Sequence, residues 1–265
     1  MLECVVNVSC GRDAVTLDAL AASCDRSLLD LHSDVDYDRS VFTLAGDHVF
    51  EDTQRLAARV FELVDFRAYS GVHPALGALD VVPFVALGDS SIGEAVEMRD
   101  RFGSWLADTF DVPVFIYGSE ATLPEVRKAA FRSILPTFGS RWSNPTLGAV
   151  CVGARGLLVA LNINLGCSLE SARVVARTLR SPQVRTLAFE AGSRVQVSMN
   201  LIDPLSITPI MVVQRVQAME VIKSVELVGL MPEAVVAGHE SEYEAYGISA
   251  EATIEERLRR QVTHS

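Results

Sequence analysis

The sequence has 265 residues, of which 49% are hydrophobic and 22% charged, and its formal net charge is −11. Such a chain has enough apolar material for one large domain or two small ones, and its composition excludes disordered, collagen-like and coiled-coil proteins. Nucleic-acid binding is also disfavoured, because 23 dispersed Lys and Arg residues supply no dense basic face. An anionic ligand must therefore meet cations that cluster locally.

The cysteines and the apolar segments indicate where the protein works. The five cysteines form no CxxC pair and no zinc-finger spacing, which is typical of reduced thiols. The first residues lack the basic flank and long apolar run of a signal peptide. The apolar region 148–165 contains Arg155 and two asparagines, which a membrane span tolerates poorly. We therefore expect a cytoplasmic protein that contacts neither membranes nor nucleic acid.

Alternating apolar residues over 2–8 predict a first strand, since successive strand side chains point to opposite faces. The elements predicted next are a helix over 13–22, strands over 27–31 and 41–45, a helix around 56–64 and a strand over 79–86. This β-α-β-β-α-β order is the ferredoxin-like pattern. A capping box of Ser91 and Glu94 then starts a helix, which is followed by a strand over 112–117 and a long loop over 135–147.

The same order of elements is predicted a second time. Its members are strands over 157–163, 184–189, 195–201 and 225–230, with helices over 168–179 and around 212–219. A peripheral helix is expected in the charged tail after residue 240. The expected fold class is therefore α+β, with two ferredoxin-like (βαββαβ) subdomains, residues 1–147 and 148–265, and a ligand cleft between them.

His73 lies in a loop that two glycines and a proline constrain, directly before a predicted strand. Such a loop can hold an imidazole rigidly where a general acid/base is needed, and an unperturbed histidine titrates near neutral pH. The alternative is a turn histidine that hydrogen-bonds its own loop. The residues of this loop leave both interpretations open.

Two further segments have both a chemical and a simpler interpretation. The acidic run 30–39, which includes His32, lacks the glycine and the final glutamate of an EF-hand calcium loop, so a solvated connection is favoured. Cys10, in a turn before a helix, is either an activated thiol or a plain small residue. No pair of histidines with a nearby carboxylate has metal-ligand spacing, so no metal site is predicted.

Several separated stretches resemble glutamate formimidoyltransferases, in the right order along the chain. The matching segments are 3–12 (ECVVNVSCGR), 28–30, 38–43, 71–84 (GVHPALGALDVVPF), 148–149, 153–155, 162–165 (NINL), 196–200 and 226–230. They span about residues 2–235, and the set is far more specific than any one motif. The chain is identified as a shortened, monofunctional member of this family, without a cyclodeaminase domain.

The resemblance implies transfer of a formimidoyl group from N-formimidoyl-L-glutamate to tetrahydrofolate, the co-substrate, in histidine degradation and one-carbon metabolism. It also implies that His73 is the catalytic group and that segment 138–147 binds folate. The residues of that segment are Phe138, Gly139, Ser140, Arg141, Trp142, Ser143, Asn144, Pro145, Thr146 and Leu147. Around the amino-acid substrate we expect Asn7, Arg12, Asp34, Arg39, Asp80 and Arg155.

The residue types suit this chemistry. Atom N5 of tetrahydrofolate attacks the amidine carbon, so a proton must leave one nitrogen and another must reach the leaving amine, and an imidazole can do both. Trp142 is a candidate for stacking on a folate ring, and Arg141 with the other arginines for binding carboxylates. Taken singly, each arginine is equally well explained by a structural ion pair.

The chain departs from the family pattern beside the histidine, where Val72 and Ala75 replace a glutamate and an arginine, and at Cys10, which replaces an acid. The segments before the folate loop and after Arg180 are also shorter. These changes leave two alternatives: a non-catalytic relative that only binds folate, and a transferase for formyl groups or another amino acid. Exposed strand edges make a homodimer a further expectation.

Overall fold

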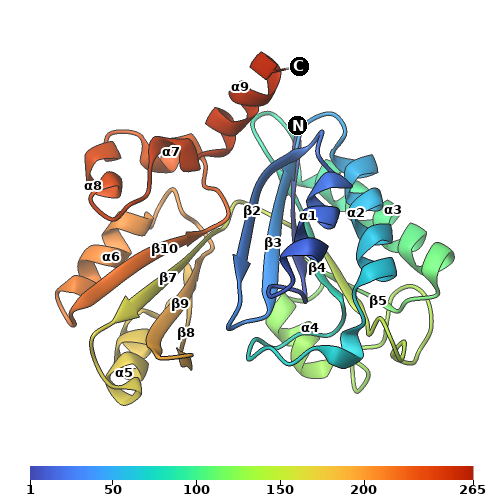
Figure 1. Cartoon of the computed structure of the whole chain (residues 1–265), viewed down its shortest axis with the longest axis horizontal. Helices are drawn as coiled ribbons and strands as arrows, with labels where there is room; N and C mark the ends of the chain where they lie inside the picture. Colours follow the sequence, from blue (N-terminus) through green and yellow to red (C-terminus); the bar gives the residue numbers. More distant parts are fainter. Residues whose placement is uncertain (265) are drawn as a thin grey trace. The chain divides into compact units, whose positions relative to one another are not determined.

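The computed structural model describes residues 1–264, apart from the side chains of residues 250 and 262–264. The chain divides into two compact units, Met1–Arg155 and Gly156–Ser265, each with its own sheet. The fold is α+β, as predicted. The division falls later than the expected one at residue 147, because the segment Val150–Arg155 is a strand of the first sheet (Figure 1).

The first unit begins with the predicted β-α-β-β-α-β order and then extends its sheet. Its elements are β1 (Leu2–Val8), α1 (Ala14–Ala22), β2 (Leu28–Asp34), β3 (Arg39–Ala45), α2 (Val49–Leu63), η1 (Phe66–Ala68), β4 (Leu79–Ala86), α3 (Ile92–Phe110), β5 (Val114–Tyr117), α4 (Leu123–Ala129) and β6 (Val150–Arg155). The strand order is β2-β3-β1-β4-β6-β5. Strands β4, β6 and β5 are parallel, whereas the pairs of β2, β3, β1 and β4 are antiparallel.

The sheet of the first unit is covered on both faces in its β4-β6-β5 part. On one face, apolar side chains such as Val82 and Val152 join the main core beneath α1, α2 and α3. On the other face, Val81 and Cys151 pack with Val126 of α4 in a smaller core. Because strand side chains alternate between faces, α4 lies on the face opposite to the three longer helices. This opposite face carries the candidate site.

An irregularity in β4 places one polar residue on that face. Asn7 of β1 pairs with Val81, but the next residue, Val8, pairs with Leu79, so Asp80 is the extra residue of a β-bulge. A bulge interrupts the alternation of side chains and re-aims the side chain at that point. The pairing of β1 with β4 therefore turns the Asp80 side chain toward the face that carries the candidate site, although Asp80 lies among buried apolar residues of β4.

The second unit contains a four-stranded antiparallel sheet of order β10-β7-β9-β8. Its elements are β7 (Val159–Leu165), α5 (Leu169–Leu179), β8 (Val184–Ala191), β9 (Arg194–Leu201), α6 (Pro209–Gln217), β10 (Ile222–Val228), α7 (Glu233–Val236), α8 (Glu240–Glu244), η2 (Ala250–Ala252) and α9 (Ile254–His264). Alternate residues of β7 and β9, such as Leu161 and Val197, pack with α5 and α6. The polar residues between them, such as Asn162, point to the other face.

Two predictions for the first unit need correction. The acidic run 30–39 is mostly strand, because β2 continues to Asp34 and β3 starts at Arg39, which leaves only a short turn between them. Helix α4 was not predicted at all, although Thr122 and Glu125 form a capping box at its start and Pro124 occupies its first turn. Among the described residues, no helix is both long enough and apolar enough to cross a membrane.

Candidate functional site

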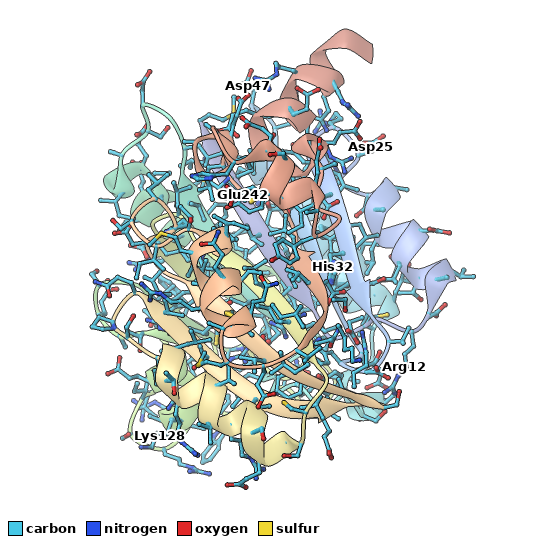
Figure 2. The ribbon with its side chains drawn as sticks, turned by 90° about the vertical axis from the view of Figure 1, so that its left-hand side faces the viewer. Arg12, Asp25, His32, Asp47, Lys128 and Glu242 are labelled. Carbon is cyan, nitrogen blue, oxygen red and sulfur yellow. The ribbon has the colours of Figure 1, made fainter. Side chains whose placement is uncertain are left out.

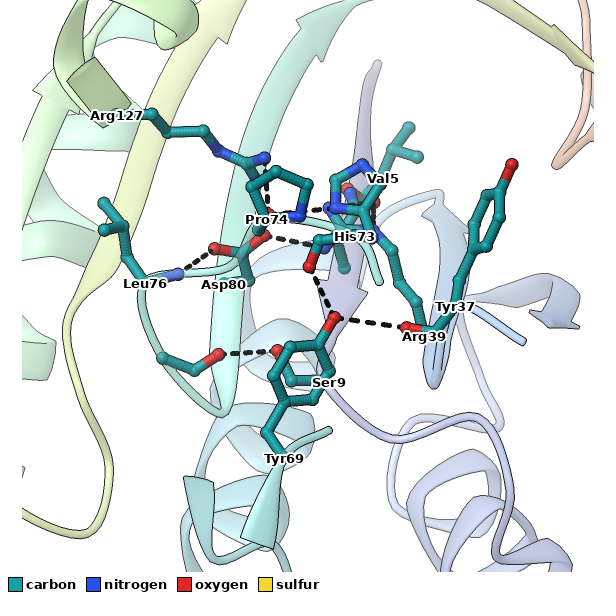
Figure 3. Close-up of polar contacts among 12 residues, drawn as sticks. Val5, Ser9, Tyr37, Arg39, Tyr69, His73, Pro74, Leu76, Asp80 and Arg127 are labelled. Carbon is teal, nitrogen blue, oxygen red and sulfur yellow. Dashed lines mark hydrogen bonds and ion pairs between the residues drawn. The ribbon is translucent and has the colours of Figure 1, made fainter. Parts of the chain in front are cut away.

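The loop between η1 and β4 holds His73 by backbone contacts (Figure 3). The hydroxyl of Tyr69 lies 2.7 Å from the carbonyl oxygen of His73 and 3.1 Å from that of Tyr37. Gly71 allows this close approach, because a Cβ at that position would lie 2.0 Å from the Tyr37 carbonyl oxygen. The loop is thus tied to the turn between β2 and β3, and the imidazole is half-buried.

The hydrogen bond of the His73 ring defines its tautomer. Nδ1 lies 2.9 Å from the carbonyl oxygen of Pro74. A carbonyl oxygen can only accept, so Nδ1 carries the hydrogen, and in the neutral ring Nε2 carries the lone pair. We infer this assignment from the geometry of the acceptor. The neutral ring therefore has its basic atom on the side away from Pro74.

The surroundings of His73 favour the neutral form. Its pKa is lowered from the ordinary 6.5 to about 3, first by burial and then by the positive charges of Arg39 and Arg127. The carboxylate of Asp80 and the Pro74 carbonyl act in the opposite direction. At physiological pH the imidazole is therefore neutral and can accept a second proton at Nε2. In the absence of a substrate, the imidazolium so formed loses that proton readily.

A buried carboxylate, Asp80, organises the charges beneath this loop. Its Oδ1 accepts from the backbone N–H of Leu76 at 2.9 Å, and its Oδ2 accepts from Nη1 of Arg39 at 2.7 Å. Nη2 of Arg127 donates to the same Oδ2. Two guanidinium groups share one carboxylate, so the cluster carries a net positive charge despite the acidic composition of the whole chain. Such a buried group of charges is stable only while its partners remain together.

Asn7 extends this cluster to the first strand. Its Oδ1 accepts from Nη2 and Nε of Arg39 at 2.9 and 3.2 Å, and its Nδ2 donates to the carbonyl oxygen of Val5 at 2.9 Å. Asn7, Arg39 and Asp80 come from β1, β3 and β4, which are neighbours in the sheet. The structure thus brings three of the six expected substrate residues together, next to the His73 loop.

Arg127 of α4 is the member of the cluster that sequence analysis missed. Besides Asp80, it binds the carbonyl oxygen of Pro74 through Nη1 at 2.8 Å. The turn before α4 is tied to α3, because Arg99 makes two hydrogen bonds with Glu120 at 2.9 and 3.0 Å. The capping box of Thr122 and Glu125 is the sequence signal that could have revealed this helix.

For the other three expected substrate residues, the hydrogen bonds and strand register give different surroundings, although Asp34 is the cross-strand neighbour of Arg39. Arg12 donates to the Val35 carbonyl oxygen at 2.8 Å and to Ser70 Oγ at 2.7 Å, and so joins two loops at the surface. Asp34 accepts from two backbone N–H groups of the turn that follows it. Arg155 lies four residues beyond Cys151, which pairs with Val81, and is therefore about 13 Å farther along the strand direction.

The segment 138–147 is fixed at its ends and exposed between them. At its start, the Phe138 carbonyl oxygen accepts from Val114 N–H at 3.0 Å, and at its end the Leu147 carbonyl oxygen accepts from Ala78 N–H at 2.9 Å. Asn144 closes the last turn by accepting from two backbone N–H groups. Trp142, at 80% exposed, lies between these anchors. The end of the segment therefore adjoins the loop that carries His73.

The surroundings of Cys10 favour the plain small residue over the activated thiol. Burial raises the pKa of its thiol, and the negative charges of Asp38 and Asp13 raise it further. Only a lowered pKa would make the thiolate available as a nucleophile near neutral pH. Cys10 is instead partly buried against the main core of the first unit.

The first unit coincides with a known protein family. The family model "Formiminotransferase domain, N-terminal subdomain" matches residues 1–155, which are the residues of the first unit. A glutamate formimidoyltransferase of Streptococcus pyogenes serotype M1 is 32% identical over 77% of this chain and 78% of the relative. One of Thermoplasma acidophilum is 30% identical over 88% of each chain.

The chain also matches longer proteins over part of their length. It is 32% identical to the formimidoyltransferase-cyclodeaminase of Rattus norvegicus over 77% of this chain, which spans 44% of that relative. These matches confirm the resemblance that the motifs around His73 and the other segments predicted. The chain belongs to the formiminotransferase family.

Proposed function

We propose that this chain is a folate-dependent formimidoyltransferase that moves the formimidoyl group of N-formimidoyl-L-glutamate to tetrahydrofolate, with His73 as general acid/base. The relatives named as glutamate formimidoyltransferases support the reaction. One observation in the structure carries the role of His73: its neutral ring presents Nε2 as a base beside a cluster of net positive charge. The finer assignments below extend the same proposal.

The proposed reaction needs proton transfers that a neutral imidazole can perform. N5 of tetrahydrofolate attacks the amidine carbon of the donor, and a new C–N bond forms in a tetrahedral intermediate. Nε2 of His73 accepts the proton that N5 loses. The imidazolium then returns a proton to the glutamate nitrogen as the old C–N bond breaks, so the protein is unchanged at the end. Such help is worth about 10² to 10⁴ in rate.

The charge cluster explains why the pKa of His73, which is low in the protein without substrate, should rise when substrate binds. Arg39 and Arg127 disfavour the imidazolium in the absence of substrate. A substrate carboxylate near them compensates their charge, and an opposite charge close to an imidazolium raises its pKa. Binding of the donor would thereby bring His73 nearer to the pH at which it can both accept and return a proton.

The exposed segment 138–147 is assigned to tetrahydrofolate, with Trp142 stacking on one of its rings. An aromatic side chain that is largely exposed in the free protein gains contact area when a flat ligand covers it. Arg141 is exposed beside it and is assigned to the glutamyl carboxylates of folate. The anchor of Leu147 on Ala78 supports a folate position adjoining the His73 loop.

The architecture assigned to each of the two units is ferredoxin-like. The order β2-β3-β1-β4 in the first unit and the order β10-β7-β9-β8 in the second support this assignment, since each follows a β-α-β-β-α-β chain. A homodimer and a cytoplasmic location stay predictions. Analytical ultracentrifugation of the purified protein would decide the first.

An absorbance assay tests the proposed function. Purified protein is incubated with N-formimidoylglutamate and tetrahydrofolate, and acid then converts the product to methenyl-tetrahydrofolate. We expect a signal with the natural protein and a loss of about 10²-fold or more in kcat with His73→Gln. No signal, beside an active reference enzyme, overturns the proposal. Calorimetric binding of tetrahydrofolate without turnover would favour the non-catalytic alternative. Turnover only with a formyl donor would favour the alternative of a transferase for formyl groups.

A further inference from the structure

We propose that Arg127 is a positioning residue that fixes the His73 imidazole, through the carbonyl group of Pro74, in the tautomer with its base at Nε2. This inference rests on the proposed role of His73 and states which residue orients the imidazole for that role. It concerns a side chain that no motif of the sequence marked, on a helix of seven residues.

The first step is the shared acceptor. The carbonyl oxygen of Pro74 lies 2.9 Å from Nδ1 of His73 and 2.8 Å from Nη1 of Arg127. A carbonyl oxygen has two lone pairs and can accept both hydrogens at once. The cationic donor polarises the carbonyl group and holds it in place, so the imidazole meets an oriented acceptor at Nδ1 and keeps its hydrogen there.

The second step is the anchoring of Arg127 itself. Its Nη2 donates to Oδ2 of Asp80, and Arg39 donates to the same oxygen. The other oxygen of Asp80, Oδ1, accepts from the Leu76 N–H (Figure 3). Its Nε is buried and has no hydrogen-bond partner among the described residues, so the two terminal nitrogens alone hold the group. The loop residue next to Pro74 is Ala75, which offers no guanidinium of its own. The bridge from strand β4 to Pro74 therefore depends on α4.

The third step is electrostatic. The groups that face His73 are the cations Arg39 of β3 and Arg127 of α4, the carboxylate Asp80 of β4, the phenol of Tyr69, and the ring of Tyr37 at a centroid distance of 6.0 Å. Arg127 disfavours the imidazolium, in which both nitrogens would be protonated. It therefore supports the neutral ring in two ways, by geometry at Pro74 and by charge.

The test combines kinetics with ¹⁵N NMR of histidine-labelled protein. In the natural protein we expect well-separated shifts of the two His73 nitrogens, as for a single neutral tautomer. In Arg127→Gln the shifts should move toward each other, the pKa of His73 should rise because a nearby cation is gone, and kcat should fall about 10-fold or more with a smaller change in KM. Arg127→Lys keeps the charge without the two-pronged geometry. It should retain most of the pKa effect and recover only part of kcat.

Lys128 supplies the matched control on the same helix. It is exposed (Figure 2), so Lys128→Gln removes the same charge from the neighbouring position without touching Pro74 or Asp80. We expect its NMR shifts and pH profile to equal those of the natural protein. Circular dichroism and urea unfolding of each variant establish that it is folded before the comparison.

The outcomes separate this inference from the proposed function. If the natural protein lacks transferase activity but Arg127→Gln alters the His73 tautomer, the function fails and the positioning role stands. If the natural protein is active and folded Arg127→Gln leaves both the tautomer and the pH profile unchanged, the positioning role is overturned. An Arg127→Gln variant that changes KM alone also overturns it, because substrate binding would then be the role of this arginine.

Discussion

Two adjacent loops of the first unit differ in how they are held. The loop of His73 is fixed along its length, by Tyr69, by Arg127 and by the Asp80 carboxylate. The segment 138–147 is fixed only near its ends, and Trp142 between them is 80% exposed. The difference suits the two tasks proposed for these loops, because a proton-transfer group requires a defined orientation, whereas a ring-binding surface must stay accessible. Changes in the first loop should therefore impair kcat, and changes in the second should impair binding.

The largest effect is expected from breaking the charge cluster with Asp80→Asn. Two guanidinium groups would then face a neutral amide in a buried position, and loss of one partner from such a group costs about 3–5 kcal/mol of unfolding free energy. Urea unfolding measures this loss. Asp89→Asn, which removes an exposed carboxylate, is the control and should leave the unfolding midpoint nearly unchanged. Equal stability of the two variants would contradict the organising role of Asp80.

A second prediction concerns pH and the His73 loop. The pKa of His73 is about 3 in the folded protein against 6.5 ordinarily, so the fold favours the neutral ring. The resulting stabilisation is complete above pH 6.5 and is lost as the pH falls from 6.5 toward 3. The unfolding free energy of the natural protein should therefore decrease, relative to His73→Gln, when unfolding is followed at pH 7.5, 6.5, 5.5 and 4.5. A constant difference across this series would show that the histidine is not held neutral.

A third prediction sharpens the contrast by changing the open segment with Trp142→Ala. Since the indole is largely exposed, unfolding should be unaffected, whereas the KM for tetrahydrofolate should rise about 2- to 10-fold, as expected for loss of one aromatic pair. Steady-state kinetics with varied folate measures this. Leu135→Ala, at a side chain that is 51% exposed in the preceding part of the loop, serves as the control. A fall in kcat at constant KM would place Trp142 in the chemistry instead.

The smallest effect is expected from Glu120→Gln, in the turn that precedes α4. Arg99 holds the pKa of this carboxyl down at about 2, so its stabilisation is present above pH 4.5 and is lost as the pH falls toward 2. Because the side chain of Glu120 is 54% exposed, solvent screening limits the loss at neutral pH to about 1 kcal/mol or less. Thermal unfolding measures this loss beside Glu97→Gln, an exposed control on α3. A loss of several kcal/mol would mean that α4 depends on this ion pair.

The sequence by itself determined the parts that depend on neighbouring residues. Alternation over 2–8 predicted β1, the capping box of Ser91 and Glu94 predicted the start of α3, and the matched segments predicted the family and the candidate His73. These are local patterns, in which the period of apolar residues or a short spacing carries the information. They also placed Asn7, Arg39 and Asp80 among the expected substrate residues.

Only the tertiary structure decided which of these residues meet. Asp80 turns toward the cluster because the pairing of β1 with β4 contains a bulge, and Arg127 reaches Pro74 because α4 packs on the face opposite to α3. Strand β6 was hidden in a continuous apolar run, since a strand buried on both faces has no polar alternation. Asp34 pairs across the strands with Arg39, yet its carboxylate accepts from the N–H groups of its own turn, and Arg155 lies four residues farther along β6 than Cys151. The physical reason is that strand pairing and helix packing bring together residues that are far apart in the chain, and no local sequence pattern specifies which distant residues will meet.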